Sequence, residues 1–212
     1  MAGGRKPLTA VTEANRREEL LRAAANLFVE KGFAATTTRD IAEAVGMRSG
    51  SPFYHFRSKQ DLLKAVMIEG LESGDARIQK AITGIDDPVQ RLRVLIRTHL
   101  GNLLEGECHA PMLLNESRSL DAPARAEIAA AFDRYQIPWQ TTLDELHHLG
   151  KIPRAASPVR LYLFGMLNWT TQWYRRNGPL SLDELADQAL EMILTLRQGE
   201  LDKRGNDTQR SR

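Results

Sequence analysis

The 212-residue sequence predicts an all-α protein of about nine helices. Two observations support this fold class. Apolar residues recur at spacings of three and four along most of the chain, and no run shows the strict alternation of a half-buried strand. Helix-capping signals also recur, from the pair Thr37 and Asp40 to the pair Ser181 and Glu184. We therefore expect a small three-helix domain at the amino terminus and a larger helical domain after it.

The stretch from Thr36 to Leu63 predicts two short helices around a turn, followed at once by a third helix. Thr37 and Asp40 form a capping box for the first helix, and Gly46 fits the left-handed conformation that ends it. The range 48–56 then forms a second short helix that crosses the first. Two short helices joined in this way are a helix-turn-helix, which places its second helix in the major groove of DNA.

The chemistry of this stretch predicts which side chains contact DNA. Arg39 and Arg48 flank the turn and are long enough to reach guanine edges, whereas Lys59 opens the next helix, where an ammonium suits a phosphate. Small residues between them allow a close backbone approach, and an aromatic ring faces the nucleic acid. The expected phosphate contacts are Thr38, Ser51, His55 and Lys59. The full set is Thr37, Thr38, Arg39, Arg48, Ser49, Gly50, Ser51, Phe53, Tyr54, His55 and Lys59.

At these residues the sequence resembles the TetR family of bacterial transcriptional repressors. The shared pattern consists of Thr37, Ile41, Ala42, Gly46, Gly50, Ser51, Phe53, His55, Phe56, Ser58, Lys59 and Gln60. It departs from the family at Arg48, where a polar cap is usual, at Pro52, where an aliphatic residue is usual, and at Phe53, where tyrosine is common. The resemblance implies a ligand-responsive repressor that binds a palindromic operator as a homodimer and is released by a small-molecule effector.

Charge and composition give the expected domain organisation. Residues 1–60 hold ten Lys and Arg against six Asp and Glu, so the basic excess coincides with the helix-turn-helix. We expect a disordered basic terminus at 1–11, the DNA-binding domain at 12–60, the ligand-binding and dimerisation domain at 61–200, and a disordered tail at 201–212. A single cysteine, Cys108, fits a reducing cytoplasm. We expect neither a signal peptide nor a membrane-spanning segment.

The larger domain is expected to contain five long helices. The first begins after Ser58, runs towards Thr83 and forms an unbroken arm between the two domains. The second opens at Asp87 and Pro88, a cap followed by a first helical position. The others span 122–149, with a kink at Pro138, then 159–176, and a last helix capped by Ser181.

The last two helices carry more apolar surface than one small domain needs. In the resembled family such helices pair with their copies in a dimer and form a four-helix bundle. A symmetric dimer is what reading the two half-sites of a palindromic operator requires. The alternative is that the same residues are ordinary core. The residues expected at the dimer interface are Trp169, Trp173, Leu182, Leu185, Ala189, Ile193 and Leu196.

The stretch from Asn168 to Ser181 resembles the carboxy-terminal signature of TetR-family members that respond to acyl-CoA thioesters. The resemblance implies an apolar effector, with an acyl-CoA first and an aromatic or multidrug compound as the alternative. The aromatic residues also fit a tryptophan-rich dimer seam, which is the simpler interpretation. The candidate lining residues are Leu95, His99, Leu103, Phe132, Tyr135, Trp139, Phe164, Asn168 and Gln172.

Other functions have little support in the sequence. The sequence contains no nucleophile elbow, zinc-protease motif, phosphate loop or dinucleotide fingerprint, so we expect neither an enzyme nor a cofactor. Metal sensing would need Cys108 with His109, or His147 with His148, but adjacent side chains point in different directions. A helical ligand-binding or scaffold protein that does not bind DNA is the alternative from a different class.

Overall fold

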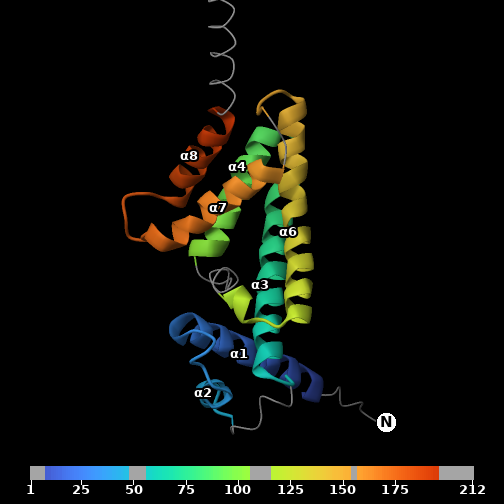
Figure 1. The fold of residues 1–212 in the computed structure, drawn as a ribbon, viewed down its shortest axis with the longest axis vertical. Helices are drawn as coiled ribbons and strands as arrows, with labels where there is room; N and C mark the ends of the chain where they lie inside the picture. The colour runs from blue at the N-terminus through green and yellow to red at the C-terminus, as the bar shows by residue number, and fades with distance from the viewer. Residues whose placement is uncertain (1–7, 48–55, 106–115, 154–156, 196–212) are drawn as a thin grey trace, which may run out of the picture. The chain divides into compact units, whose positions relative to one another are not determined.

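The computed structural model describes residues 8–47, 56–105, 116–153 and 157–195. These residues form seven α-helices and one short 3-10 helix (Figure 1). They are α1 (Leu8–Lys31), α2 (Thr38–Ala44), α3 (Lys59–Ile82), α4 (Pro88–Leu104), η2 (Ser117–Ser119), α6 (Ala122–His148), α7 (Ser157–Trp173) and α8 (Leu182–Thr195). The described residues contain no strand, which confirms the all-α prediction. The expected count of about nine is slightly too high, and one of the expected helices, at 48–56, lies almost wholly outside the described residues.

The helices begin where the sequence places their caps. The side chain of Asp87 accepts the amide hydrogens of Val89 and Gln90, and Pro88 follows at the first helical position. Ser181 and Glu184 exchange side-chain to backbone hydrogen bonds before α8, which is a complete capping box. These bonds satisfy amide hydrogens that have no partner within the helix. The local signals therefore set the helix starts.

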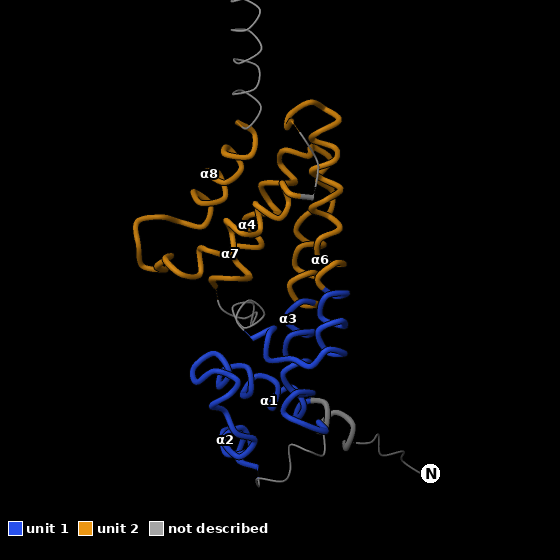
Figure 2. Tube along the Cα trace, in the orientation of Figure 1, with its two compact units in different colours: residues 1–71, 109–131 blue, residues 72–108, 132–212 orange. Residues whose placement is uncertain are grey.

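The chain divides into two compact units, coloured separately in Figure 2. Unit 1 comprises residues 1–71 and 109–131, and unit 2 comprises residues 72–108 and 132–212. The division falls within α3 and within α6, whereas the sequence suggested a single boundary after residue 60. Residues 61–71 and the segment that leads into α6 therefore belong with the helix-turn-helix region.

The core of unit 1 lies between α1, α2 and the start of α3. Its buried side chains are Leu20, Leu21, Ala24, Phe28, Phe33, Ile41, Ala42, Phe56, Leu62 and Leu63. The rings of Phe28 and Phe33 lie 5.3 Å apart. The buried residues of α1 lie on one face of the helix, and α1 packs against α2 of the helix-turn-helix region.

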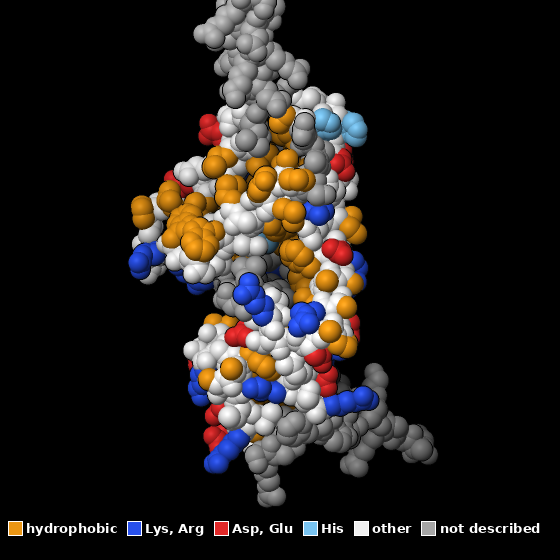
Figure 3. All heavy atoms as spheres, viewed as in Figure 1, with side chains coloured by type: hydrophobic (Ala, Val, Ile, Leu, Met, Phe, Trp, Pro, Cys, Tyr) orange, Lys and Arg blue, Asp and Glu red, His pale blue; other side chains and the backbone are white. Residues whose placement is uncertain are grey.

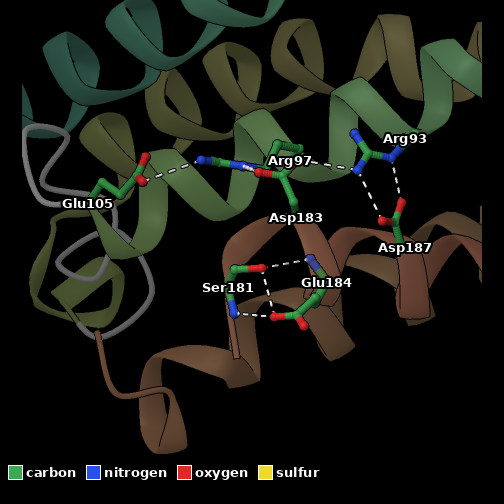
Figure 4. A network of polar contacts seen from close by, with 7 residues as sticks. All are labelled: Arg93, Arg97, Glu105, Ser181, Asp183, Glu184 and Asp187. Carbon is green, nitrogen blue, oxygen red and sulfur yellow. Dashed lines mark hydrogen bonds and ion pairs between the residues drawn. The ribbon is translucent and has the colours of Figure 1, made fainter. Parts of the chain in front are cut away.

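Unit 2 packs α4 against both α7 and α8. Two arginines of α4 form ion pairs with α8: Arg93 binds Asp187 and Asp183, and Arg97 binds Asp183. Arg97 also pairs with Glu105, at the end of its own helix (Figure 4). On another side of unit 2, Gly74 of α3 accepts a hydrogen bond from the buried side chain of Asn102 on α4. The helix α6 continues through Pro138. Within the described ranges, none of the helices combines the length and apolarity needed to cross a bilayer.

Candidate nucleic-acid interface and effector site

The first helix of the helix-turn-helix has the predicted capping geometry. The Thr37 hydroxyl oxygen accepts the Asp40 amide hydrogen at 3.1 Å, and a carboxylate oxygen of Asp40 accepts the Thr37 amide hydrogen at 2.8 Å. These bonds hold the pKa of Asp40 below its usual value. Gly46 ends the helix with φ of +65°, the left-handed conformation that the sequence predicted. The geometry fixes how α2 enters and leaves the turn.

Arg39 lies on the solvent-facing side of α2. Its side chain is 77% exposed and donates from Nε to Glu43 at 2.8 Å, one helical turn away. This carboxylate raises the pKa of the Arg39 guanidinium. An exposed pair of this kind exchanges readily for another anion or acceptor. The side chains of Thr37 and Asp40 are occupied by the cap, and base contact by the exposed Arg39 stays a prediction.

Lys59 has an internal role that the sequence did not predict. Its ammonium donates to the backbone oxygens of Phe33 and Thr36, each at 2.8 Å, and lies 4.2 Å from the centre of the Phe33 ring. These bonds tie the start of α3 to the loop between α1 and α2. Since an ammonium has three donors, at most one is left for a phosphate. Phosphate contact by Lys59 remains a prediction.

Seven of the residues predicted to contact DNA lie outside the described residues: Arg48, Ser49, Gly50, Ser51, Phe53, Tyr54 and His55. Of the described members, Thr38 is half-buried at the start of α2. Phe56, the last residue of the predicted recognition helix, is buried in unit 1. The base and phosphate contacts assigned to this set stay predictions.

A second group of contacts in unit 1 was not anticipated from the sequence. One carboxylate oxygen of Glu116 accepts the Phe33 amide hydrogen at 3.0 Å, and the other accepts the Ser119 hydroxyl at 2.7 Å. Gln60 also donates to the Ser119 backbone oxygen. These bonds join the helix-turn-helix region to the segment that leads into α6. They escaped prediction because partners so far apart along the chain leave no local pattern.

Eight of the nine predicted effector residues lie in unit 2, either in one cluster of polar and aromatic side chains or in the core beside that cluster. At the centre is His99, which is buried. Its Nδ1 lies 2.7 Å from the Tyr135 hydroxyl oxygen, and its Nε2 lies 3.1 Å from the Asn168 side-chain oxygen. An amide oxygen can only accept, so Nε2 carries the proton and Nδ1 accepts from Tyr135. We call Tyr135, His99 and Asn168 the polar chain.

Aromatic rings surround the polar chain. Trp139 and Phe164 meet His99 edge to face at 5.5 and 5.2 Å, and Phe132 stacks beside Tyr135 at 6.2 Å. The predicted residues Leu95 and Leu103 are buried on the same helix as His99. Burial lowers the pKa of His99 from 6.5 to about 4, against the opposing hydrogen bond to Asn168. The imidazole is therefore neutral at physiological pH.

Gln172 does not join this cluster. Its side chain is exposed and donates to the Thr171 hydroxyl beside it. The prediction placed Gln172 in the lining because amides interleaved with aromatic residues could line a cavity, but its side chain lies at the surface. Near that end of α7, an open pocket of about 330 Å³ is lined by Leu104, Glu105, Tyr174 and Arg176.

The apolar residues predicted at the dimer interface separate into two groups. Leu182, Leu185, Ala189 and Ile193 are buried within the single chain, where α8 packs on α4. Packing within the chain already covers these side chains, and their place at a dimer interface stays a prediction. Leu196 lies outside the described residues. By contrast, Trp169 and Trp173 are exposed, at 66% and 47%.

The exposed apolar face of α7 extends beyond the two tryptophans. Leu161 and Tyr162 are exposed as well, and Gly165 lies between them and Trp169 by helical spacing. Figure 3 shows hydrophobic side chains gathered over α7 on the face in view. We call Leu161, Tyr162, Trp169 and Trp173 the outer face of α7. Leu161 and Tyr162 were not among the residues predicted at the interface.

The structure offers no support for a metal centre in the parts of the chain that it describes. No group of three or more potential metal ligands lies together there. His147 Nδ1 lies 3.3 Å from the Ile152 backbone oxygen, and its ring faces that of His148 at 6.0 Å. Cys108 and His109 lie outside the described residues.

Comparisons with known proteins agree with this arrangement. Residues 20–66 match the family described as bacterial regulatory proteins, tetR family, and residues 85–196 match the tetracyclin repressor-like carboxy-terminal domain. The two matches define a bacterial helix-turn-helix transcriptional regulator. The chain belongs to the TetR family.

Three known proteins are similar to this chain over most of its length. The HTH-type transcriptional repressor KstR2 of Mycolicibacterium smegmatis is 28% identical over 191 residues, covering 89% of this chain and 93% of that protein. AibR, solved in complex with isovaleryl coenzyme A and operator DNA, is 25% identical with a TM-score of 0.78, covering 84% of this chain and 98% of AibR. The structure named superantigen PfiT is 39% identical with a TM-score of 0.75, covering 90% of this chain and 98% of PfiT.

Proposed function

We propose that the protein is a cytoplasmic transcriptional repressor that binds a palindromic operator as a homodimer and releases it when a small-molecule effector binds. An acyl-CoA thioester is the first candidate effector. The observation that carries the proposal is the coexistence of a capped α2 with an exposed Arg39 and, in unit 2, a neutral polar chain enclosed by aromatic rings.

DNA binding is supported by the local geometry of α2 and by the match at residues 20–66. Arg39 is the described side chain best placed to read a base, because it is exposed and its partner Glu43 is exposed too. A bidentate arginine to guanine is the commonest specific contact in the major groove. The described part of the helix-turn-helix is thus consistent with sequence-specific readout.

Dimerisation is supported by the outer face of α7. Large aromatic side chains exposed together usually mark an interaction site, since monomers rarely leave such patches uncovered. A second copy of the same face would bury them across a two-fold axis and set the spacing of two recognition helices. We expect that interface to bury well over about 1,000 Å².

An acyl-CoA effector is supported by two features of unit 2. The aromatic shell around the polar chain suits an apolar acyl group. The pocket lined by Leu104, Glu105, Tyr174 and Arg176 offers an aromatic ring and a guanidinium for a phosphorylated nucleotide. Both α4 and α7 pass from the shell to this pocket, since Leu104 follows His99 by five residues and Tyr174 follows Asn168 by six. That is roughly 7–9 Å along each axis. AibR, a relative of similar fold, was solved with an acyl-CoA.

Release requires that the effector prefer one of two conformations. A ligand that binds both equally well shifts nothing. Since α3 and α6 each contribute residues to both units, they are the elements through which such a preference would act. A coupling of about 1–3 kcal/mol lowers operator affinity roughly 5- to 150-fold.

The proposal is tested by fluorescence anisotropy on the DNA upstream of the protein's own reading frame. We expect salt-dependent binding that is much tighter than binding to random DNA, and release by an acyl-CoA but not by free CoA or free fatty acids. Equal affinity for both DNAs would favour a helical protein with a function other than transcription, which matters because PfiT is named a superantigen. Release by a planar drug favours a multidrug sensor, and release by zinc or nickel a metal sensor.

Arg39 provides a sharper test with a matched control. Arg22 on α1 is also an exposed arginine paired with a glutamate one turn away, Glu18, at 2.9 Å. Arg39→Ala should lower operator affinity roughly 5- to 150-fold and relax specificity at one base pair. Arg22→Ala should leave that specificity unchanged. Equal losses for Arg39→Ala on operator and random DNA would contradict base readout.

Lys59 separates a structural role from a phosphate contact. Lys59→Ala removes both bonds to the loop before α2, so we expect a lower melting temperature together with weaker binding to all DNA sequences alike. Lys59→Arg keeps the charge but does not fit the same two carbonyls. If Lys59→Arg restores DNA affinity while the melting temperature stays low, the charge itself acts on phosphate.

A further inference from the structure

Trp139 is an exception among the buried polar groups of unit 2. Its side chain is 0% exposed, and its single polar atom, the indole Nε1, has no hydrogen-bond partner. In the polar chain beside it, by contrast, both nitrogens of His99 are satisfied by Tyr135 and Asn168. The aromatic shell therefore contains one buried donor without an acceptor.

The other unpaired buried atoms are of a different kind. Gln60, Gln136 and Gln140 each leave a side-chain oxygen unpaired but donate from their amide nitrogens to Ser119, Phe132 and Asp144, respectively. Arg160 has an unpaired buried Nε, but its guanidinium carries four further donors. Among the described residues, Trp139 is the buried side chain whose only polar atom has no partner.

An unpaired buried N–H has a definite energetic cost. Leaving such a donor unsatisfied destabilises the folded protein by roughly 1–3 kcal/mol, and unpaired donors in native proteins are few. A phenylalanine in the same shell would carry no such cost. The indole at this position is explained if a ligand supplies the missing acceptor.

The surroundings of Trp139 restrict what that acceptor is. The ring centres of His99 and Phe164 lie 5.5 and 4.8 Å from that of the indole, and the buried imidazole of His99 is neutral. A carboxylate would lose its hydration in exchange for one neutral donor, which is unfavourable. A cation has no lone pair to offer an N–H. A neutral carbonyl oxygen next to an apolar body meets both requirements.

We propose that Trp139 Nε1 donates a hydrogen bond to a neutral carbonyl oxygen of the effector and thereby selects acyl thioesters over free fatty acids. This inference rests on the proposed function, because it names how the effector site of the repressor chooses its ligand. A ketone on an apolar ring system presents the same chemistry, so both sources belong in the test.

The direct measurement is the indole N–H signal in a proton–nitrogen correlation spectrum of the full-length protein. The chain has three tryptophans, and Trp139→Phe identifies the signal of Trp139 by its disappearance. An acyl-CoA thioester, its thioether analogue without the carbonyl, the free fatty acid and an apolar ketone are each titrated. We expect a downfield shift of the Trp139 signal with the thioester, and with the ketone if it is the natural source, but not with the thioether.

Affinities provide the second measurement. The wild-type protein should bind the thioester roughly tenfold more tightly than the thioether, since one hydrogen bond is gained. Trp139→Phe should bind the two alike. Leu143→Val is the matched control, because it trims a buried side chain of α6 one turn away and removes no donor. It should leave the thioester to thioether ratio at the wild-type value.

The outcomes separate the two proposals. If wild type binds thioester and thioether equally, or if the Trp139 signal does not move with the thioester, the donor assignment is wrong while the acyl-CoA repressor stands. If neither compound binds but a planar drug releases operator DNA, the acyl-CoA function is wrong as well. If Trp139→Phe does not fold, the wild-type spectrum alone decides, with the signals of Trp169 and Trp173 as internal references.

Discussion

The helix α8 buries its apolar stripe against α4 of the same chain, whereas α7 buries one face and leaves a second apolar face in solvent. The sequence predicted that both helices lie at the dimer interface. Opposite its stripe, α8 carries Asp183, Glu184, Asp187 and Glu191. A helix with one apolar face has nothing left for a partner once its own core has used it. The outer face of α7, which is apolar where α8 is acidic, is therefore the better candidate for the dimer interface.

The largest effect is expected where α8 meets the core. Ile193→Asp places a carboxylate among buried apolar side chains, so it should unfold unit 2 rather than only dissociate a dimer. The lost side chain alone costs about 2–5 kcal/mol in unfolding free energy. Circular dichroism would measure the melting temperature. A folded monomer with the wild-type melting temperature would show that Ile193 lies at the interface after all.

A charge on the outer face of α7 should dissociate the dimer without unfolding the chain, unlike the charge at Ile193. Trp169→Asp should convert the dimer to a monomer in sedimentation and leave the helical content intact, since the side chain is largely exposed within one chain. Central aromatic residues of interfaces often contribute at least about 2 kcal/mol to binding. Met192→Asp, an exposed change on α8, is the comparison variant. A Trp169→Asp protein that remains dimeric would place the interface elsewhere.

The buried His99 of α4, which binds Asn168 on the inward face of α7, predicts a pH dependence. The pKa of His99 is lowered from 6.5 to about 4 by burial, so the folded protein does not take up the proton that the unfolded chain binds. Stability from this group is thus fully present above pH 6.5 and falls as the pH drops towards 4, by at most about 1.4 kcal/mol per pH unit. Denaturant unfolding at several pH values should show that slope. His99→Gln should remove the contribution of His99 to the slope of unfolding free energy against pH. An unchanged slope in this variant would mean that other groups cause the pH dependence.

The smallest effect is expected at the ion pairs between α4 and α8. Arg93→Ala removes contacts to Asp183 and Asp187 that are largely exposed, so we expect a loss below about 1 kcal/mol in unfolding free energy, reduced further by salt. These contacts hold the pKa of Asp187 below its usual value. A loss as large as that of Ile193→Asp would mean that charge pairs, rather than the apolar stripe, attach α8 to α4.

Much of the candidate site was predictable, but unevenly. His99, Tyr135, Trp139 and Phe164 were predicted to line one effector site, and the structure brings these side chains together. The sequence could not predict the order of the hydrogen bonds in the polar chain, nor that the indole N–H of Trp139 has no partner. Both depend on side chains from different helices meeting within about 3 Å of one another.

The sequence by itself determined where helices begin and end, because the responsible contacts act within four residues. The box of Thr37 with Asp40, the left-handed Gly46 and the box of Ser181 with Glu184 are contacts of this kind. It also determined the family, through the residue types around the turn. Tertiary structure alone decided which apolar face each helix buries and what Lys59 binds. Those outcomes depend on partners brought from distant parts of the chain, for which local spacing carries no signal.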